Sequence, residues 1–205
     1  MFTAADSAAL ALLDAREPLL PGQRTVVRTL TLFGEHALRF AAARGIKIVC
    51  LAYRQRFVQA SPALRRLDID VDSWPAPPAG LFVVEERTMY LRSRSPMTVA
   101  HEFGHALDCA LGDGTYRSGS DPRVREAFLA AREFVTPYAA TALDEYFAEG
   151  VRAYVEANDP RSLWPRATRE RFRRLDPAMH AYVAELFEHE LSVRGANRAW
   201  DMRTV

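Results

Sequence analysis

The chain has 205 residues, of which 49% are hydrophobic and 26% are charged, and its net charge is +1 at pH 7. This length suits one domain with a sizeable core, so we expect residues 1–205 to form a single domain. The balanced charge gives no argument for a nucleic-acid partner, and no apolar stretch approaches the length that crosses a bilayer. No basic start followed by an apolar run is present at the N-terminus. We therefore expect a protein that is cytoplasmic or exported by a leaderless route.

The N-terminal half predicts helices followed by short strands. Apolar periodicity predicts helices over residues 3–16, 23–44 and 55–67, the last interrupted at Pro62. The continuous β-rich run 46–52 predicts a strand that is buried on both faces. After a Pro-rich loop over 70–80, the runs 81–86 and 88–92 predict a β-hairpin.

The segment after this hairpin is the most informative part of the chain. Ser95 is a favourable N-cap, Pro96 suits the first helical position, and Gly112 indicates a helix end. The predicted helix carries the pattern His-Glu-x-x-His from His101 to His105.

This pattern has a chemical meaning on a helix. Residues four positions apart share one face, so His101 and His105 can both bind one Zn²⁺, the expected cofactor. Glu102 lies close to that point, where a carboxylate acts as the general base toward a water molecule. The motif therefore makes a zinc-dependent peptidase the leading hypothesis.

A catalytic zinc site needs a third protein ligand, and a second helix supplies a candidate. The predicted helix 141–157 starts with Thr141 and Asp144, which resemble a weak capping box. We expect Glu145 to be the third zinc ligand. Glu149, one turn later, is placed to accept a hydrogen bond from the free ring nitrogen of a zinc-bound histidine. The competing interpretation is a solvated acidic face on an amphipathic helix.

Three segments together resemble a known family. Residues 101–108, Tyr138 and residues 145–149 are similar to the catalytic domain of anthrax toxin lethal factor and to the related secreted Pro-Pro endopeptidases. The resemblance implies that zinc is bound by His101, His105 and Glu145, with Glu102 as general base. It also implies that Tyr138 stabilises the tetrahedral intermediate, a role open to a phenol O–H near a metal. The alternative for Tyr138 is a loop tyrosine packed on the core.

The remaining features predict scaffold. Helices are expected over residues 123–135, 166–174 and 177–194, after a polar loop over 112–122. Cys50 and Cys109 are expected to be buried free thiols. The arginine-rich run 161–174 predicts a solvated helix face, with an acidic partner as the alternative. His180 and His189 lack the spacing needed to bind one metal.

These observations predict an α+β, zincin-like metallopeptidase domain with a small mixed sheet, an HExxH helix and a mostly helical C-terminal half. Its partner is expected to be a peptide or protein substrate. Two alternatives remain open: a cytosolic regulatory metallopeptidase that cleaves a repressor-type protein, and a zinc-stabilised binding module without catalysis. The strand at 81–86 is expected to line the cleft as a sheet edge, unless the hairpin is covered on both sides. The sequence leaves the oligomeric state open.

Overall fold

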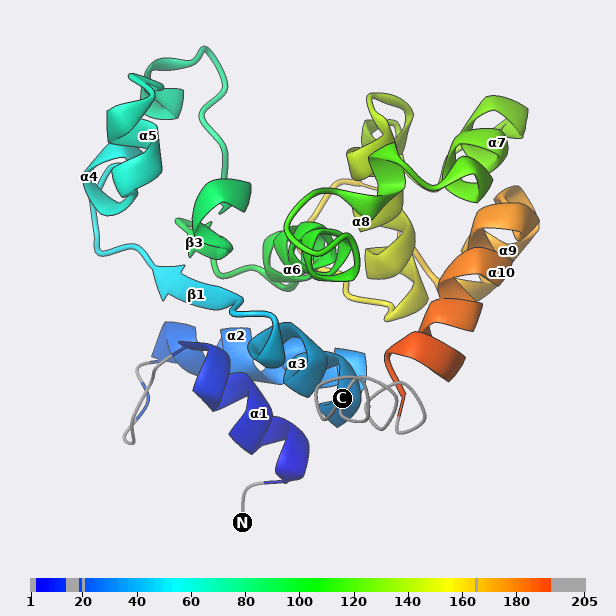
Figure 1. Ribbon diagram of the computed structural model, residues 1–205, viewed down its shortest axis with the longest axis horizontal. Coiled ribbons are helices and arrows are strands. Elements are labelled where there is room, and N and C mark those ends of the chain that lie inside the picture. Colours follow the sequence, from blue (N-terminus) through cyan, green and yellow to red (C-terminus); the bar gives the residue numbers. More distant parts are fainter. Residues whose placement is uncertain (1–2, 14–18, 20, 165, 193–205) are drawn as a thin grey trace, which may run out of the picture.

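A small sheet lies between two groups of helices in the computed structural model of the chain (Figure 1). The structure describes residues 3–13, 19, 21–164 and 166–192. The predicted helical residues 14–16 and 193–194 lie outside this part of the chain. Within it, no helix combines the length and the apolar character needed to cross a membrane.

The sheet has three strands in the order β1-β3-β2. They are β1 (Lys47–Cys50), β2 (Gly80–Val83) and β3 (Thr88–Leu91), with β1 parallel and β2 antiparallel to β3. The expectation that the first strand is buried on both faces is wrong. Because β1 pairs with β3 alone among the described residues, it is an edge strand, and Lys47 and Val49 are exposed while Ile48 is buried.

The predicted hairpin is present, but its first strand is shorter than expected. The chain leaves β2 in a 3₁₀ turn over Val84–Glu86 and reverses at Arg87, whose φ of 49° is left-handed. The carbonyl of Ala79 accepts a hydrogen bond from the N–H of Arg92, so these two residues form a hydrogen-bonded pair. Along antiparallel strands, hydrogen-bonded pairs alternate with pairs whose backbone groups point away from the partner strand. The backbone groups of Gly80 and Phe82 therefore point away from β3, toward the open edge.

Three helices pack against one another beside β1. They are α1 (Ala4–Leu13), α2 (Pro21–Leu30) and α3 (Gly34–Ala43). The continuous helix predicted over 23–44 is interrupted by a 3₁₀ turn at Thr31–Phe33, because Gly34 adopts a φ of +80° that few other residues tolerate. The break at Pro62 is as predicted, between α4 (Phe57–Ala60) and α5 (Pro62–Arg66).

The C-terminal half is helical, as predicted. Its helices are α6 (Pro96–Leu111), α7 (Pro122–Ala130), α8 (Leu143–Tyr154), α9 (Arg169–Leu175) and α10 (Pro177–Glu185), which continues as a π-helical turn over Leu186–Glu190. Helix α8 begins after Ala142 without a side-chain cap, so the predicted capping box is wrong. The Thr141 hydroxyl instead donates to the carbonyl of Tyr138.

Helices α6 and α8 lie side by side at very close range. A Cβ atom at Gly104 of α6 would lie 2.8 Å from the Cα of Ala148 on α8, so only glycine fits there. The apolar stripe of α6, which includes Val99, Phe103 and Ala106, is fully buried as predicted. One buried hydrophobic cluster extends from α1 to α10, which is compatible with a single domain, and that organisation stays a prediction.

Candidate metal centre

Helix α6 presents its two histidines because its start is fixed by local signals. The Ser95 hydroxyl accepts a hydrogen bond from the N–H of Thr98, and Pro96 occupies the first turn. With the apolar stripe buried in the core, His101 and His105 face α8, and their rings meet edge to face with centroids 4.8 Å apart.

Three side chains converge at the contact between the two helices. The Nε2 atoms of His101 and His105 are 3.1 Å apart, and the Oε2 atom of Glu145 lies 3.1 Å and 3.3 Å from them, respectively. One atom from each residue lies within 4.8 Å of the others, so the group could hold a metal ion. Among the described residues, this is the one group of histidines, cysteines and carboxylates with such an arrangement.

The chemistry of these three donor atoms suits the binding of a cation. Nδ1 of His101 lies 2.9 Å from Oε1 of Glu149, so a neutral His101 ring would carry its proton on Nδ1 and keep a lone pair on Nε2. Oε2 of Glu145 is buried without a hydrogen-bond donor in suitable geometry. Electron pairs that face one another repel unless a proton or a cation lies between them, and a bound cation would satisfy all three atoms at once. Two imidazoles and one carboxylate form a donor set that suits Zn²⁺.

Glu149 links this cluster to the protein interior. Besides His101, its carboxylate accepts hydrogen bonds from the Thr136 hydroxyl at 2.6 Å and from Nε and Nη2 of Arg152 at 2.8 Å and 2.9 Å. Arg152 is 1% exposed and also donates to the carbonyl of Ala157. This network fixes the orientation of the His101 ring. Sequence reasoning anticipated Glu149, but it did not identify Thr136.

The charges in the cluster reinforce one another. Burial alone would lower the pKa of His101, but the Glu145 and Glu149 carboxylates raise it to about 10. Burial opposes ionisation of both carboxyl groups as well, yet the histidines hold the pKa of Glu145 well below its usual range. His101 and Arg152 do the same for Glu149. The anionic carboxylates therefore create a site that attracts positive charge.

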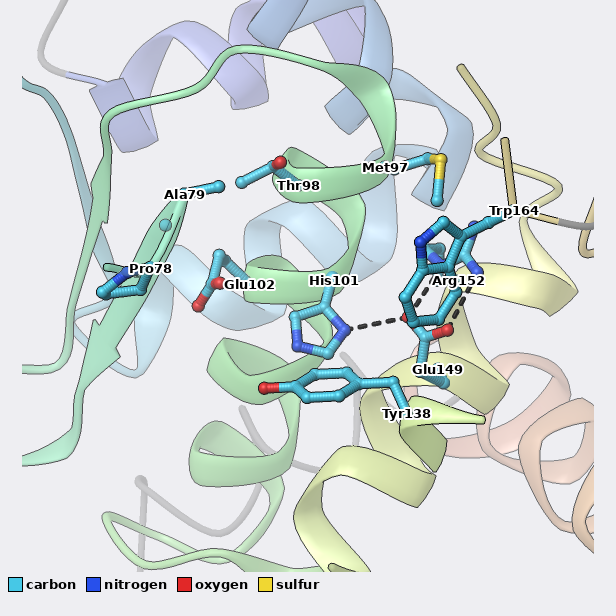
Figure 2. A pocket seen from close by; sticks show the side chains of 11 residues that line it. Pro78, Ala79, Met97, Thr98, His101, Glu102, Tyr138, Glu149, Arg152 and Trp164 are labelled. Carbon is cyan, nitrogen blue, oxygen red and sulfur yellow. Dashed lines mark hydrogen bonds and ion pairs between the residues drawn. The ribbon is translucent and has the colours of Figure 1, made fainter. Parts of the chain in front are cut away.

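Glu102 and Tyr138 both lie beside His101, with Glu102 to the left of the imidazole and the Tyr138 ring below it in Figure 2. Glu102 is 8% exposed, and burial raises the pKa of its carboxyl group, opposed by the two histidines and the N–H of Phe82. The Tyr138 hydroxyl donates to Oε1 of Glu145 at 3.0 Å, and its ring centroid is 5.4 Å from that of His101. The five predicted site residues therefore lie next to one another in the folded chain.

Other candidate residues have different surroundings. Asp108 is buried and accepts hydrogen bonds from the N–H and hydroxyl of Ser118, at 2.8 Å and 2.5 Å. Cys109 is a buried free thiol as predicted, whereas Cys50 is a free thiol that is only partly buried. The arginine-rich run 161–174 was predicted to be solvated. Arg171 departs from this prediction, because its side chain donates a hydrogen bond to the carbonyl of Val135.

A cavity of about 390 Å³ opens beside the cluster. Its lining combines site residues, the start of α6, the approach to β2 and a residue from the segment between α8 and α9: Pro78, Ala79, Gly80, Met97, Thr98, His101, Glu102, Tyr138, Glu149, Arg152 and Trp164. Sequence reasoning missed Gly80 and Trp164. Their roles depend on contacts between distant segments, for which the sequence carries no local signal.

Comparison with known proteins identifies the fold. No family model and no curated protein matches the sequence. The structure is similar to that of the Pro-Pro endopeptidase PPEP-2 from Paenibacillus alvei, with a TM-score of 0.62 and 20% sequence identity over 90% of this chain and 100% of that chain. The chain thus has the predicted α+β, zincin-like fold. Of the two predicted resemblances, the one to Pro-Pro endopeptidases has this structural counterpart, and the one to lethal factor stays a prediction.

Proposed function

We propose that this protein is a zinc-dependent endopeptidase. The observation that carries the proposal is the convergence of His101 Nε2, His105 Nε2 and Glu145 Oε2 on one point, next to the Glu102 carboxylate and an open cavity. These three residues would hold the ion. The similarity of the fold to a Pro-Pro endopeptidase supports the same class of reaction.

Each neighbouring residue has a defined task in this proposal. When bound, Zn²⁺ would supply a Lewis acid that polarises a peptide carbonyl and acidifies a water molecule. Glu102 takes the proton of the attacking water and delivers it to the leaving amine. Its buried setting raises the pKa of the carboxyl group, which makes it a stronger base. Tyr138 donates its O–H to the oxyanion as the carbonyl carbon becomes tetrahedral.

The free edge of β2 would hold the substrate. The outward backbone groups of Gly80 lie at the cavity that also contains His101 and Glu102. An extended peptide that pairs with this edge would lie across the cluster and bring one carbonyl to it, as in β-augmentation. We therefore propose a peptide or a flexible protein segment as the substrate.

The test has two parts, metal content and cleavage. The purified protein should contain one zinc per chain and cleave members of a broad peptide library, detected by mass spectrometry, and a chelator should abolish cleavage. Glu102→Gln should keep its zinc and lose nearly all activity, because the ligands remain and the base is gone. Zinc without cleavage of any peptide would favour the non-catalytic binding module. Absence of zinc would contradict the proposed metal site.

A further inference from the structure

Trp164 is an aromatic residue whose position the metal site does not require. It belongs to the segment between α8 and α9, its side chain lines the cavity, and it is 46% exposed. Figure 2 shows its indole beside Met97, in front of Arg152 and Glu149. A large exposed aromatic surface in a cavity is typical of a site where another molecule is bound.

The segment that carries Trp164 is held at its base. The Asn158 side chain donates to the carbonyl of Ala167 at 2.8 Å and accepts from the N–H of the same residue at 2.9 Å. Ala167 is fully buried, and the N–H of Trp164 donates to the Ser162 hydroxyl at 3.1 Å. These contacts anchor the two ends of the segment and the backbone of Trp164.

The two charged side chains behind the indole, Arg152 and Glu149, are already paired. Arg152 binds the Glu149 carboxylate through two nitrogens and the carbonyl of Ala157 through a third, and Glu149 also binds His101 and Thr136. A charged ligand side chain placed beside the indole would lose its hydration without gaining an ionic partner. The carbon surfaces of Met97 and Trp164 favour an uncharged, apolar side chain instead.

We propose that Trp164 and Met97 form a specificity subsite that receives an apolar side chain of the peptide next to the scissile bond. This inference rests on the proposed endopeptidase function and deepens it by naming a substrate class. The competing explanation is that Trp164 only covers the buried Arg152–Glu149 ion pair. The two explanations differ in whether the loss of the indole affects all peptides equally.

The experiment compares two peptides that differ at one residue next to the cleaved bond. A peptide-library profile of the parent defines a cleaved sequence, and its apolar residue is then replaced by aspartate in the second peptide. We expect Trp164→Ala to raise KM for the apolar peptide roughly tenfold or more and to reduce the preference for it, while Trp164→Phe keeps the preference. Leu163→Ala is the matched control, because Leu163 is fully exposed next to Trp164 and should behave like the parent.

Binding provides a readout that does not depend on turnover. In the Glu102→Gln background, fluorescence anisotropy of dye-labelled versions of the same two peptides should give Kd values that change with Trp164→Ala as KM does. If the parent cleaves peptides but Trp164→Ala leaves the preference unchanged, the subsite is wrong and the proposed function stands. An equal loss for both peptides, with lower zinc content and Tm, would assign Trp164 to covering the ion pair. If the parent cleaves no peptide, the proposed function fails, and the subsite fails with it.

Discussion

Gly80 on β2 and Glu102 on α6 are so close that no side chain fits between them. A Cβ atom at Gly80 would lie 2.6 Å from Cγ of Glu102 and 2.9 Å from Cγ2 of Thr98. The N–H of Phe82, on the same strand edge, favours the charged form of the Glu102 carboxyl group. The strand edge and the proposed general base therefore form one unit, and the position of each constrains the other.

This contact makes Gly80→Ala informative. The added methyl group should push Glu102 out of position, so we expect kcat to fall roughly 10²-fold, as small displacements of catalytic groups do, while zinc content stays the same. Steady-state kinetics and metal analysis measure the two effects. Gly119→Ala is the control, since a Cβ atom there meets nothing within 4 Å. A Gly80→Ala enzyme with the kcat of the parent would show that Glu102 tolerates the displacement.

Glu145 and Asp144 are neighbouring acids, and only Glu145 lies in the cluster. We expect Glu145→Ala to weaken zinc binding by more than the roughly 10–100-fold typical of losing an outer hydrogen-bond partner, because a direct ligand is lost. Asp144→Ala should bind zinc like the parent. Competition with a chromogenic chelator measures both affinities. Equal affinities for Glu145→Ala and the parent would remove Glu145 from the site.

Tyr138 offers a test of oxyanion stabilisation. Tyr138→Phe keeps the ring next to His101 and removes the hydroxyl, so we expect unchanged zinc content, a similar KM and a kcat lower by about 10²-fold. Tyr53→Phe, at a residue that is 89% exposed, controls for the loss of a hydroxyl group. Turnover at the parental rate would leave Tyr138 as a packing residue.

Asp108 predicts a pH dependence of stability. Burial raises the pKa of its carboxyl group to about 6, against 3.8 as the ordinary value, despite the opposing hydrogen bonds from Ser118. The folded state then holds this proton more tightly than the unfolded state, so the contribution of Asp108 is most favourable below pH 4 and is lost as the pH rises toward 6. We expect Asp108→Asn to gain stability relative to the parent over this interval, by up to about 3 kcal/mol.

Urea unfolding of the metal-free protein between pH 4 and pH 7 measures this difference. Asp113→Asn is the matched control, because the Asp113 side chain is 82% exposed. A difference between Asp108→Asn and the parent that stays constant with pH would contradict the raised pKa.

The sequence predicted the parts of the fold that local signals determine. Helix α6 starts and ends as Ser95, Pro96 and Gly112 indicate, because capping and the first turn involve residues that are near in sequence. His101, Glu102 and His105 on α6 and Glu145 on α8 could be predicted for a related reason, since helical geometry places side chains four positions apart on one face. Tyr138 lies in the 3₁₀ turn Tyr138–Ala140, and its place in the site was predicted from the family resemblance instead. The break before Gly34 was missed because the surrounding apolar pattern continues through it.

Other features depend on contacts that no local pattern encodes. The exposed side of β1 follows from its place at the sheet edge, although its composition resembles that of a central strand. The hydrogen bond from Thr136 to Glu149 and the approach of Trp164 to the cavity depend on how α8 is connected to its neighbours. Such residues become visible only when the tertiary structure is known.

The packing of α6 against α8 also has a consequence for when the proposed metal site could form during synthesis. The donors lie on two helices, and 44 positions (145 minus 101) separate His101 from Glu145. At roughly 5–20 residues per second, a ribosome needs about 2–9 s to add that interval. A nascent chain that exposes α6 alone offers only the two imidazoles, which any divalent ion of the cell could occupy weakly. In the proposed metal site, the complete set of three donors would therefore exist only after α8 has emerged and packed against α6.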